Sequence, residues 1–565
     1  MAGGLLQLVG KGAQDQLVTG NPSFTHFRSV YKRHTDFAME HFRLYFKTSV
    51  LTFPLTGTLT LRTKVERYAQ LLNDCYFNID LPNIYSPVYS SGNPYDFQWV
   101  RNIGYNMIRR VSILINGQEI VRHTGEWMKL YANLTFDANK KAILDRMIGN
   151  VPELYDPANA LGRTGTYPSA VSPSALIDAE PSIHGRTLMI PLHFWFCETI
   201  GQALPMVALQ QSEVEIVVEL NNAYQLFTVL DVRPTVGTRI NGTRIPPEPS
   251  DPAFSMSHFL SPPLYNDGSQ NKIFLRTWNM NPFLECNYIF VSDTELNYLA
   301  RMDHSFIISQ VDMTQADGQY GPSNDLELTM KNLVTRILWV FQRSDRINQN
   351  DPDNYTNWLN PYEFPPIPVG SIGSGPAIDS NVSQRDILLE STLMLDGQER
   401  FSPKQTLFFS GLQLYRFQTG NPIVGVYEYS FALKNDPSQP SGSINGSMFN
   451  KTLLRNTLIT PPAASGGGGG IPAGGNAVAC ILKSTAGSKN PVQVLPAQTR
   501  PSIGPNGEII PPLYGPEDVI SIVTKTDATG SPLNSFQYTY SVRAYTESYN
   551  FLRITGGIGN VVFSS

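Results

Sequence analysis

The stretch ILINGQE at residues 113–119 returns in altered form as LMLDGQE at residues 393–399. In each copy, an Asn-Gly or Asp-Gly pair separates an apolar run from a short polar continuation. Such pairs are typical of two-residue type I′ hairpin turns, because both central residues of that turn need a positive φ. The shared Gln-Glu and the offset of 280 residues predict that one antiparallel unit is built twice. The expected turn residues are Asn116, Gly117, Asp396 and Gly397.

A second pair of segments repeats at an offset of about 270 residues. Residues 23–31, SFTHFRSVY, place apolar side chains at helical spacing behind a serine and lead into a strand-like run at 42–53. Residues 293–302, DTELNYLARM, have the same form behind an Asp or Thr cap and precede the strand-like run at 306–313. We therefore expect a helix in each segment and a domain boundary near 293–303.

Length and composition indicate a large all-β protein. One hydrophobic core stops growing at roughly 250–300 residues, so a chain of 565 residues should hold at least two domains. Only 16% of the residues are charged, and 44 Gly and 42 Pro favour a loop-rich architecture. Runs rich in β-branched and aromatic residues, bounded by turn residues, predict sandwiches or barrels. They include 42–53, 58–63, 187–196, 214–220, 336–342 and 538–546. Long loops are expected at 143–185, 222–283, 343–388 and 457–518.

Charge and cysteine usage disfavour several classes of partner. The formal net charge of −5 leaves no basic footprint for wrapping nucleic acid, so we expect no direct nucleic-acid binding. The first residues form too short an apolar run for a signal peptide, and no run of 18 apolar residues occurs. We expect a cytosolic product without a membrane span. The cysteines lack a CxxC pair, which predicts buried free thiols instead of disulfides or a zinc site. They are Cys75, Cys197, Cys286 and Cys480.

The residue patterns predict no catalytic, metal or cofactor site. The eight histidines form no HxH, HExxH or HxxxH pair, and His123 with Glu126 lacks the second histidine of a cupin-type metal site. The run GSIGSG at 370–375 opens no expected helix and is interpreted as a loop. DPDNYTN at 351–357 lacks the glycine and the distal glutamate of a calcium loop. We therefore expect a protein that is not an enzyme and has no cofactor.

Six N-x-S/T sequons are possible glycosylation sites. Without a secretory signal, most are expected to be chance matches in a chain rich in Asn, Ser and Thr. They lie at Asn133, Asn241, Asn354, Asn381, Asn445 and Asn450.

Blocks spread along the chain resemble the major capsid proteins of nucleocytoplasmic large DNA viruses, of the chlorella virus and iridovirus type. The opening GGLLQLVGKGAQDQLVTGNPSFTHFRSVYKRHTDFAME and the later LMIPLHFWFCETIGQALPMVALQQSEVEI are the longest of them. All follow the order of the family, although the insertions are long for a compact member. The blocks are 3–40, 188–216, 287–311, 395–401, 425–446 and 549–563.

The resemblance implies a double jelly roll, that is, two consecutive eight-stranded antiparallel jelly rolls with long loop insertions and short linking helices. It implies a structural virion protein, the major capsid protein, made in the host cytoplasm or a viral factory. Homotrimers would form pseudo-hexagonal capsomers that tile an icosahedral shell. Further expected partners are neighbouring capsomers, minor capsid proteins and inner membrane components. The implied division is an arm at 1–26, jelly rolls at 27–293 and 303–565, and a linker helix at 294–302.

The apolar residues of the expected arm have two interpretations. Capsid arms of this kind reach along the inner face of the shell to neighbouring proteins, whereas a frayed terminus would pack on its own jelly roll. Two other functions stay open for the whole chain. One is a minor or penton capsid component, usually a single jelly roll, and the other is a carbohydrate-binding jelly-roll protein. The arm residues expected to make contacts are Leu5, Leu6, Leu8 and Val9.

Overall fold

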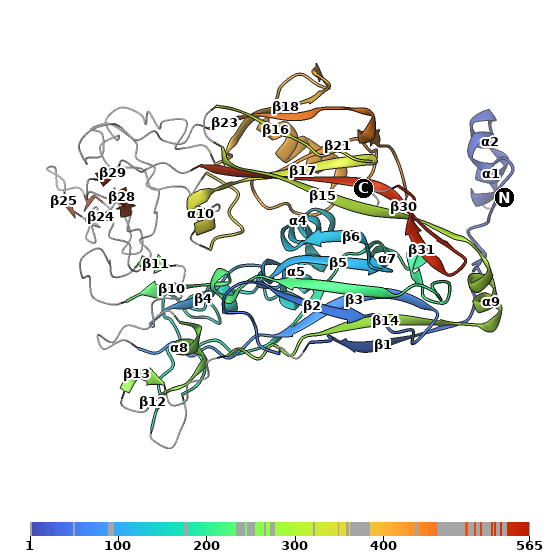
Figure 1. The fold of residues 1–565 in the computed structure, drawn as a ribbon. Coiled ribbons are helices and arrows are strands. Elements are labelled where there is room, and N and C mark those ends of the chain that lie inside the picture. Colours follow the sequence, from blue (N-terminus) through green and yellow to red (C-terminus); the bar gives the residue numbers. More distant parts are fainter. Residues whose placement is uncertain are drawn as a thin grey trace.

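The computed structural model contains two antiparallel β-sandwiches, which lie one above the other in Figure 1 and are joined by a helix at one edge. It describes residues 3–563 with gaps. The gaps are 49–50, 89–94, 175–178, 233–242, 246–254, 265–266, 272–276, 320–321, 349, 358–360, 362–384, 436–438 and, within 460–538, everything outside the short strands β24 to β29.

The first sandwich encloses its core between a sheet of order β1-β14-β3-β7, with β8 paired to β3, and a sheet of order β2-β9-β5-β6. In β2, Leu61 and Thr63 are buried while Thr60 and Arg62 are exposed, which is the alternation of a strand with one face on a core. The strands are β1 (Phe37–Tyr45), β2 (Leu59–Lys64), β3 (Leu71–Asp80), β5 (Ile108–Ile115), β6 (Gln118–Thr124), β7 (Thr187–Pro191), β8 (Leu204–Pro205), β9 (Val214–Leu220) and β14 (Phe283–Val291).

The second sandwich repeats this plan. One sheet has the order β15-β30-β17-β21, with β22 and β31 at its margins, and the other has the order β16-β23-β18-β19, with β20 paired to β18. Its core centres on Trp339, which packs against Phe409 and Tyr427. The strands are β15 (His304–Gln319), β16 (Ser323–Glu327), β17 (Leu333–Arg343), β18 (Leu388–Leu395), β19 (Gln398–Glu399), β20 (Lys404–Gln405), β21 (Val426–Ser430), β22 (Ile444–Asn445), β23 (Thr452–Leu458), β30 (Tyr540–Thr555) and β31 (Ile558–Val561).

The helices are short and lie mostly at the ends and margins of the sheets. None in the described part of the chain is long and apolar enough to cross a membrane. They are α1 (Gly3–Val9), α2 (Ala13–Thr19), α3 (Ile103–Met107), α4 (Gly125–Thr135), α5 (Ala138–Met147), α6 (Pro152–Tyr155), α7 (Trp195–Glu198), α8 (Met256–Leu260), α9 (Asp293–Arg301), α10 (Ser344–Asn348) and α12 (Gln413–Phe417). Smaller strands are β4 (Phe97–Trp99), β10 (Phe227–Asp231), β11 (Thr243–Ile245), β12 (Pro263–Leu264) and β13 (Asp267–Asn271).

The two Gly-containing turns have the backbone that their dipeptides require. Asn116 and Gly117 have φ values of 53° and 78° and connect β5 to β6, with Ile115 opposite Gln118. The turn at 396–397 has φ values of 47° and 83° and connects β18 to β19. The same two-residue hairpin thus occurs once in each sandwich. In the first it lies in the sheet without β1 and β14, and in the second it lies in the sheet without β15 and β30.

Helix α9 connects the two sandwiches. It follows β14, lies at one edge of the molecule and leads into β15 (Figure 1). Asp293 and Glu295 in its first turn and Arg301 in its last turn complement the helix dipole. A helix is present as the spacing predicts, but its N-cap is Ser292 and the expected Asp or Thr cap was wrong.

The predicted helix over 23–31 was wrong. Those residues form turns and irregular chain, and the helices of this region are α1 and α2. Phe24 and Phe27 are 67% and 99% exposed, so no surface covers the apolar face of the expected helix. A helix of nine residues is marginal in water without such packing, which explains why helical spacing alone is insufficient here.

Two strand predictions had wrong limits. The sequence predicts one strand over 42–53, but β1 begins at Phe37 and ends at Tyr45, opposite Phe283. The run at 187–196 continues past β7 into α7, because the strand ends at Pro191. Helices α4 and α5 were missed, although in α4 the buried Trp127, Leu130, Tyr131 and Leu134 recur at helical spacing.

We predict that Gly397→Ala lowers the free energy of unfolding by roughly 1–2 kcal/mol, the cost of a left-handed backbone for a residue with a Cβ. Nothing lies within 4 Å of the added Cβ, so the effect is one of backbone conformation alone. Gly201→Ala is the matched control, because Gly201 is also exposed and open but has no positive φ. Equal denaturant midpoints for the two variants would contradict the turn assignment.

Candidate functional site: the seam between the two sandwiches

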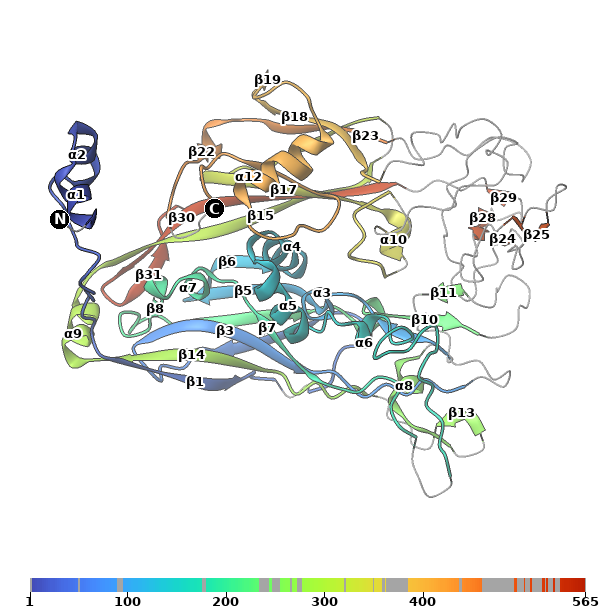
Figure 2. The same cartoon turned by 180° about the vertical axis from the view of Figure 1, so that it is seen from behind.

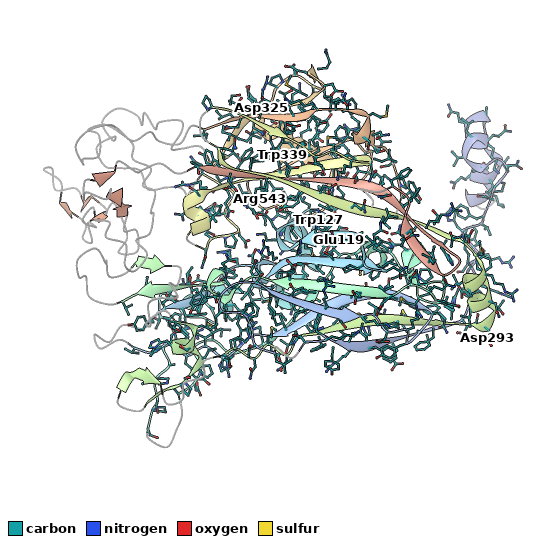
Figure 3. All side chains as sticks on the ribbon, viewed as in Figure 1. Glu119, Trp127, Asp293, Asp325, Trp339 and Arg543 are labelled. Carbon is teal, nitrogen blue, oxygen red and sulfur yellow. The ribbon has the colours of Figure 1, made fainter. Side chains whose placement is uncertain are left out.

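The two sandwiches meet along a seam, defined here as the contact of α4 and its flanking residues with β17, β30 and residues 350–357. Figure 2 shows α4 between β6 below and β15 above, and Figure 3 places Trp127, a residue of α4, below Arg543 of β30. The apolar core of the first sandwich continues across it to Leu338, Tyr355 and Tyr545. The seam is therefore packed as a protein interior.

Local sequence positions α4 for this contact. The Thr124 hydroxyl accepts a hydrogen bond from the Trp127 amide at 3.1 Å, which caps the helix. At Gly125 a Cβ would lie 2.1 Å from the Tyr105 carbonyl oxygen, so only glycine allows this close approach. Glu126 follows in the first turn and is directed at the second sandwich.

The central ion pair of the seam joins Glu126 to Arg543. Two guanidinium nitrogens of Arg543 donate to the two carboxylate oxygens at 2.5 and 2.7 Å. The hydroxyls of Tyr355 and Tyr545 donate to the same carboxylate at 2.8 and 2.5 Å. Burial alone would raise the pKa of Glu126, but the charge and hydrogen bonds of Arg543 outweigh it and lower the pKa to about 2. One carboxylate of the first sandwich is thus held by three side chains of the second.

A second ion pair lies close to the first. The Lys129 ammonium, 1% exposed, donates to Asp353 Oδ1 at 2.5 Å, and the Asn102 amide donates to Asp353 Oδ2 at 2.6 Å. Asp353 belongs to the segment 351–357, which superficially resembles a calcium loop. In the structure its carboxylate binds a lysine of the first sandwich. The short contact between the two charges and the hydrogen bond from the Asn102 amide offset the cost of burying Lys129 and Asp353.

A third buried cluster surrounds Arg336 of β17. Its Nε donates to Glu547 at 2.5 Å, and its guanidinium lies 3.8 Å from Glu428. Burial raises the pKa of Glu428 to about 7; Arg336 opposes that shift and Glu547 adds to it. The Arg336 guanidinium also lies 5.8 Å from the ring of Tyr131 in α4. The cluster therefore joins the sheet of the second sandwich to the helix of the first.

Hydrogen bonds to main-chain groups extend the seam to both ends. The Gln310 side chain donates to the Ile120 carbonyl at 2.7 Å, and Asn350 donates to the Tyr224 carbonyl at 2.6 Å. At the other end the β30–β31 hairpin reaches back to the first sandwich, where the Gly557 carbonyl accepts from Ser212 at 3.1 Å. The two sandwiches are consequently fixed in one orientation along the whole contact.

The arrangement offers no metal centre. Within the described ranges, no group of three or more His, Cys, Asp or Glu side chains could hold an ion. His123 is buried and stacked on Trp127 at 4.2 Å between ring centroids, and burial lowers its pKa to about 3. His123 is therefore a neutral core residue, and both carboxylate oxygens of nearby Glu126 accept hydrogen bonds from Arg543.

The N-terminal residues project away from both sandwiches. Helices α1 and α2 stand apart from the body in Figures 1 and 2, and neither has a buried residue. The side chains of Leu5, Leu6, Leu8 and Val9 are 50–76% exposed. The alternative in which they pack on their own jelly roll is therefore not the arrangement in this structure.

The sequence matches two family models in the order of the two sandwiches. Residues 25–256 match the model "Major capsid protein N-terminus", and residues 295–470 match "Large eukaryotic DNA virus major capsid protein". The chain belongs to the major capsid proteins of large eukaryotic DNA viruses. As a major capsid protein it is a structural component of the virion and lies in the icosahedral capsid shell. This decides against the carbohydrate-binding alternative.

Curated relatives of this capsid protein cover most of its length. Probable capsid protein 4 of Acanthamoeba polyphaga mimivirus is 28% identical over 79% of this chain and 91% of its own. The major capsid protein of Phaeocystis pouchetii virus is 28% identical over 81% and 93%. That of Paramecium bursaria Chlorella virus 1 is 25% identical over 81% and 88%. The similarity therefore spans both sandwiches and not one shared domain.

Solved structures confirm the double jelly roll. A chain of the PBCV-1 virus capsid aligns with a TM-score of 0.58 at 20% identity, over 96% of this chain and all of that one. The Faustovirus major capsid protein aligns with the same TM-score at 12% identity, over 98% and 96%. At these identities the alignments establish the fold of the capsid protein.

The predicted glycosylation acceptors differ in access. Asn445 and Asn450 are exposed, whereas Asn133 is partly buried and donates to the Lys129 carbonyl at 2.7 Å. Asn354 is 1% exposed, so the folded chain has no room for a glycan there, and this candidate was wrong. Asn241 and Asn381 lie outside the described residues.

The charged residues of the seam were missed in the sequence. Arg336 and Arg543 interrupt strand-like apolar runs at 336–342 and 538–546, and a charge in a buried strand needs a partner. That signal marks the two arginines as paired. It does not identify Glu126 or Glu547 as the partners, because those residues are brought near only by the fold.

We predict opposite pH dependences for the wild-type capsid protein and Arg543→Leu. In the wild type, the folded pKa of Glu126 lies below its ordinary value, so its contribution of about 3 kcal/mol is present above pH 4.5 and lost as the pH falls towards 2. Without Arg543, burial dominates and raises that pKa. The variant should lose roughly 3–5 kcal/mol at pH 7 and recover part of it on acidification.

Denaturant unfolding between pH 7 and pH 3 measures both effects. Arg455→Leu is the matched control, because it removes an exposed ion pair with Asp325 and should change stability little at any pH. The seam assignment is wrong if Arg543→Leu and Arg455→Leu unfold at the same denaturant concentration at pH 7.

Proposed function

We propose that three copies of this capsid protein form a pseudo-hexagonal capsomer that tiles the shell. The observation that carries the proposal is the buried seam, which holds two sandwiches of like topology side by side as one body. Three such bodies around a three-fold axis present six similar sandwiches, and a near-hexagon tiles a surface. A single chain with two jelly rolls also disfavours the penton alternative, whose usual form has one.

Exposed apolar side chains on the second sandwich support contacts between chains. Leu407, Tyr415, Leu433 and Met448 are 74–88% exposed. Tyr415 lies in α12, Leu407 just before the helical segment that leads into it, and Leu433 and Met448 between β21 and β23. Apolar surface of this kind marks interfaces in proteins that are otherwise well packed. Interfaces within an obligate trimer bury roughly 2,000 Å² or more, and we propose that these residues belong to one.

We further propose that the chain acts only as a shell component and is not an enzyme. The structural role of its relatives supports this. So does the pairing of Glu126 with Arg543 and of Lys129 with Asp353, which occupies these charges in joining the two sandwiches. We retain the division into an arm at 1–26, two jelly rolls and a linker helix as a proposal. In this division the exposed, irregular chain continues beyond the arm to β1 at Phe37.

The arm is proposed to contact partners on the inner side of the shell. Its apolar side chains are exposed and stand beyond the sandwiches, so contact with a neighbouring capsomer, a minor capsid protein or a component of an inner membrane would bury them. The exposed Asn445 and Asn450, in the sequons Asn-Gly-Ser and Asn-Lys-Thr, are proposed as the acceptors for any glycan.

Light scattering of the purified capsid protein should give about 188 kDa, three times the 62.8 kDa of one chain. Negative-stain images of the same peak should show hexagonal outlines, because six similar sandwiches surround the axis. A stable monomer of about 63 kDa at micromolar concentration would contradict a self-sufficient trimer.

Deletion of residues 2–20 should leave the trimer mass unchanged and reduce the yield of closed shells, because α1 and α2 contribute no buried residue to the sandwiches. Co-expression with the other shell proteins, followed by sedimentation, measures that yield. Replacement of Leu5, Leu6, Leu8 and Val9 by Ser is the milder companion variant. Wild-type shell yields for both would overturn the role of the arm.

A further inference from the structure

Three free thiols of the first sandwich lie together, although they are far apart in the sequence. Cys75 on β3 and Cys286 on β14 are buried, and Cys197 at the end of α7 is partly buried. The sulfurs of Cys75 and Cys286 are 3.3 Å apart. Burial, together with the nearby thiols of Cys197 and Cys286, raises the pKa of the Cys75 thiol well above its ordinary value.

The backbone at Cys75 and Cys286 already has the geometry of a disulfide. The two residues are directly opposite each other in the antiparallel pair β3–β14. Directly opposed residues in such pairs have Cα atoms about 4.5–5.5 Å apart, within the range of about 4.4–6.8 Å that disulfides span. The register of β14 shifts immediately after Cys286, and an irregularity of this kind lets the strand adjust locally. The register and the 3.3 Å between the two sulfurs are therefore compatible with closure of a disulfide.

A cavity provides a route for an oxidant to this buried pair. It has a volume of about 240 Å³ and is lined by both Cys75 and Cys197, with Asp74, Lys140 and His193 adding polar groups. A water molecule takes up about 30 Å³ of liquid volume, so a peroxide molecule fits. Cys197 is the most accessible of the three sulfurs and would meet the oxidant first.

We propose that Cys75 and Cys286 are a modification site, which closes to a disulfide when the capsid protein leaves a reducing compartment and meets a peroxide. The peroxide oxidises the Cys197 thiol to a sulfenic acid and releases one water. The Cys75 sulfur attacks that sulfur, and its proton leaves with the hydroxyl group as a second water. Cys286 then attacks the Cys75 sulfur, and Cys197 departs and takes up the proton of Cys286.

The balance of these steps is two thiols oxidised and one peroxide O–O bond reduced to two waters. The product covalently joins β3 to β14, the strand that runs directly into α9 and the second sandwich. Because the bond closes a long loop of the chain, it would restrict the unfolded state and stabilise the particle after release, while the reduced chain could still fold and assemble. This proposal does not depend on the trimer.

The test begins with the assembled wild-type protein, treated with hydrogen peroxide and then alkylated in denaturant without reductant. Peptide mapping should recover the peptide of Cys75 linked to that of Cys286, with a mass lower by two hydrogens and Cys197 alkylated. The apparent Tm should rise by roughly 5–10 °C and return to its original value after reduction. Recovery of all three thiols alkylated, or of Cys75 linked only to Cys197, would overturn the proposal.

Serine variants separate the roles of the thiols. Cys286→Ser should abolish both the linked peptide and the Tm rise, while Cys197→Ser should slow the linkage by about tenfold, because the remaining sulfurs are buried. Cys480→Ser, at a position outside the described residues, is the control and should behave as the wild type. An unchanged rate in Cys197→Ser would remove Cys197 from the route. Should Cys286→Ser fail to fold, the wild-type peptide map still decides whether the bond forms.

Discussion

The bidentate ion pair between Glu126 and Arg543 is the interaction on which the arrangement of this capsid protein depends most. It joins the first turn of α4 to the long strand β30, and only 17% of the Glu126 side chain and 13% of the Arg543 side chain are exposed. A buried charge without its partner is costly, so the pair penalises every orientation of the two sandwiches that would separate it. Apolar packing supplies attraction across the same surface but does not by itself choose an angle.

The neighbouring clusters act in the same direction. Lys129 with Asp353, and Arg336 with Glu547 and Glu428, place each buried cation against carboxylates of defined geometry. Replacing such groups by apolar residues of equal volume can be neutral or even stabilising in other proteins, so their value here lies in specificity of orientation. The proposed capsomer would need that property, because lateral contacts made by both sandwiches would fit their neighbours only if the angle between the sandwiches is constant.

The molecule combines this rigid body with a projecting arm. Inside the sandwiches, aromatic and aliphatic side chains are buried, whereas α1 and α2 expose theirs and stand away from the body. The contrast follows from the number of available contacts, since two seven-residue helices are too short to form a core of their own. In the first sandwich, the register of β3 and β14 brings two residues that are distant in the sequence, Cys75 and Cys286, to lie opposite each other.

The duplication, the all-β class, the two Gly-containing hairpins and the helix near 293 were predictable from the amino-acid sequence, because each depends on neighbouring residues and on a local backbone preference. The resemblance to the capsid family added the double jelly roll. Three other features follow from the folded arrangement: residues 23–31 are not helical, Asn354 is inaccessible, and Glu126 faces Arg543. Those outcomes depend on which surfaces cover a segment and on contacts between residues hundreds of positions apart, and local spacing carries no information about either.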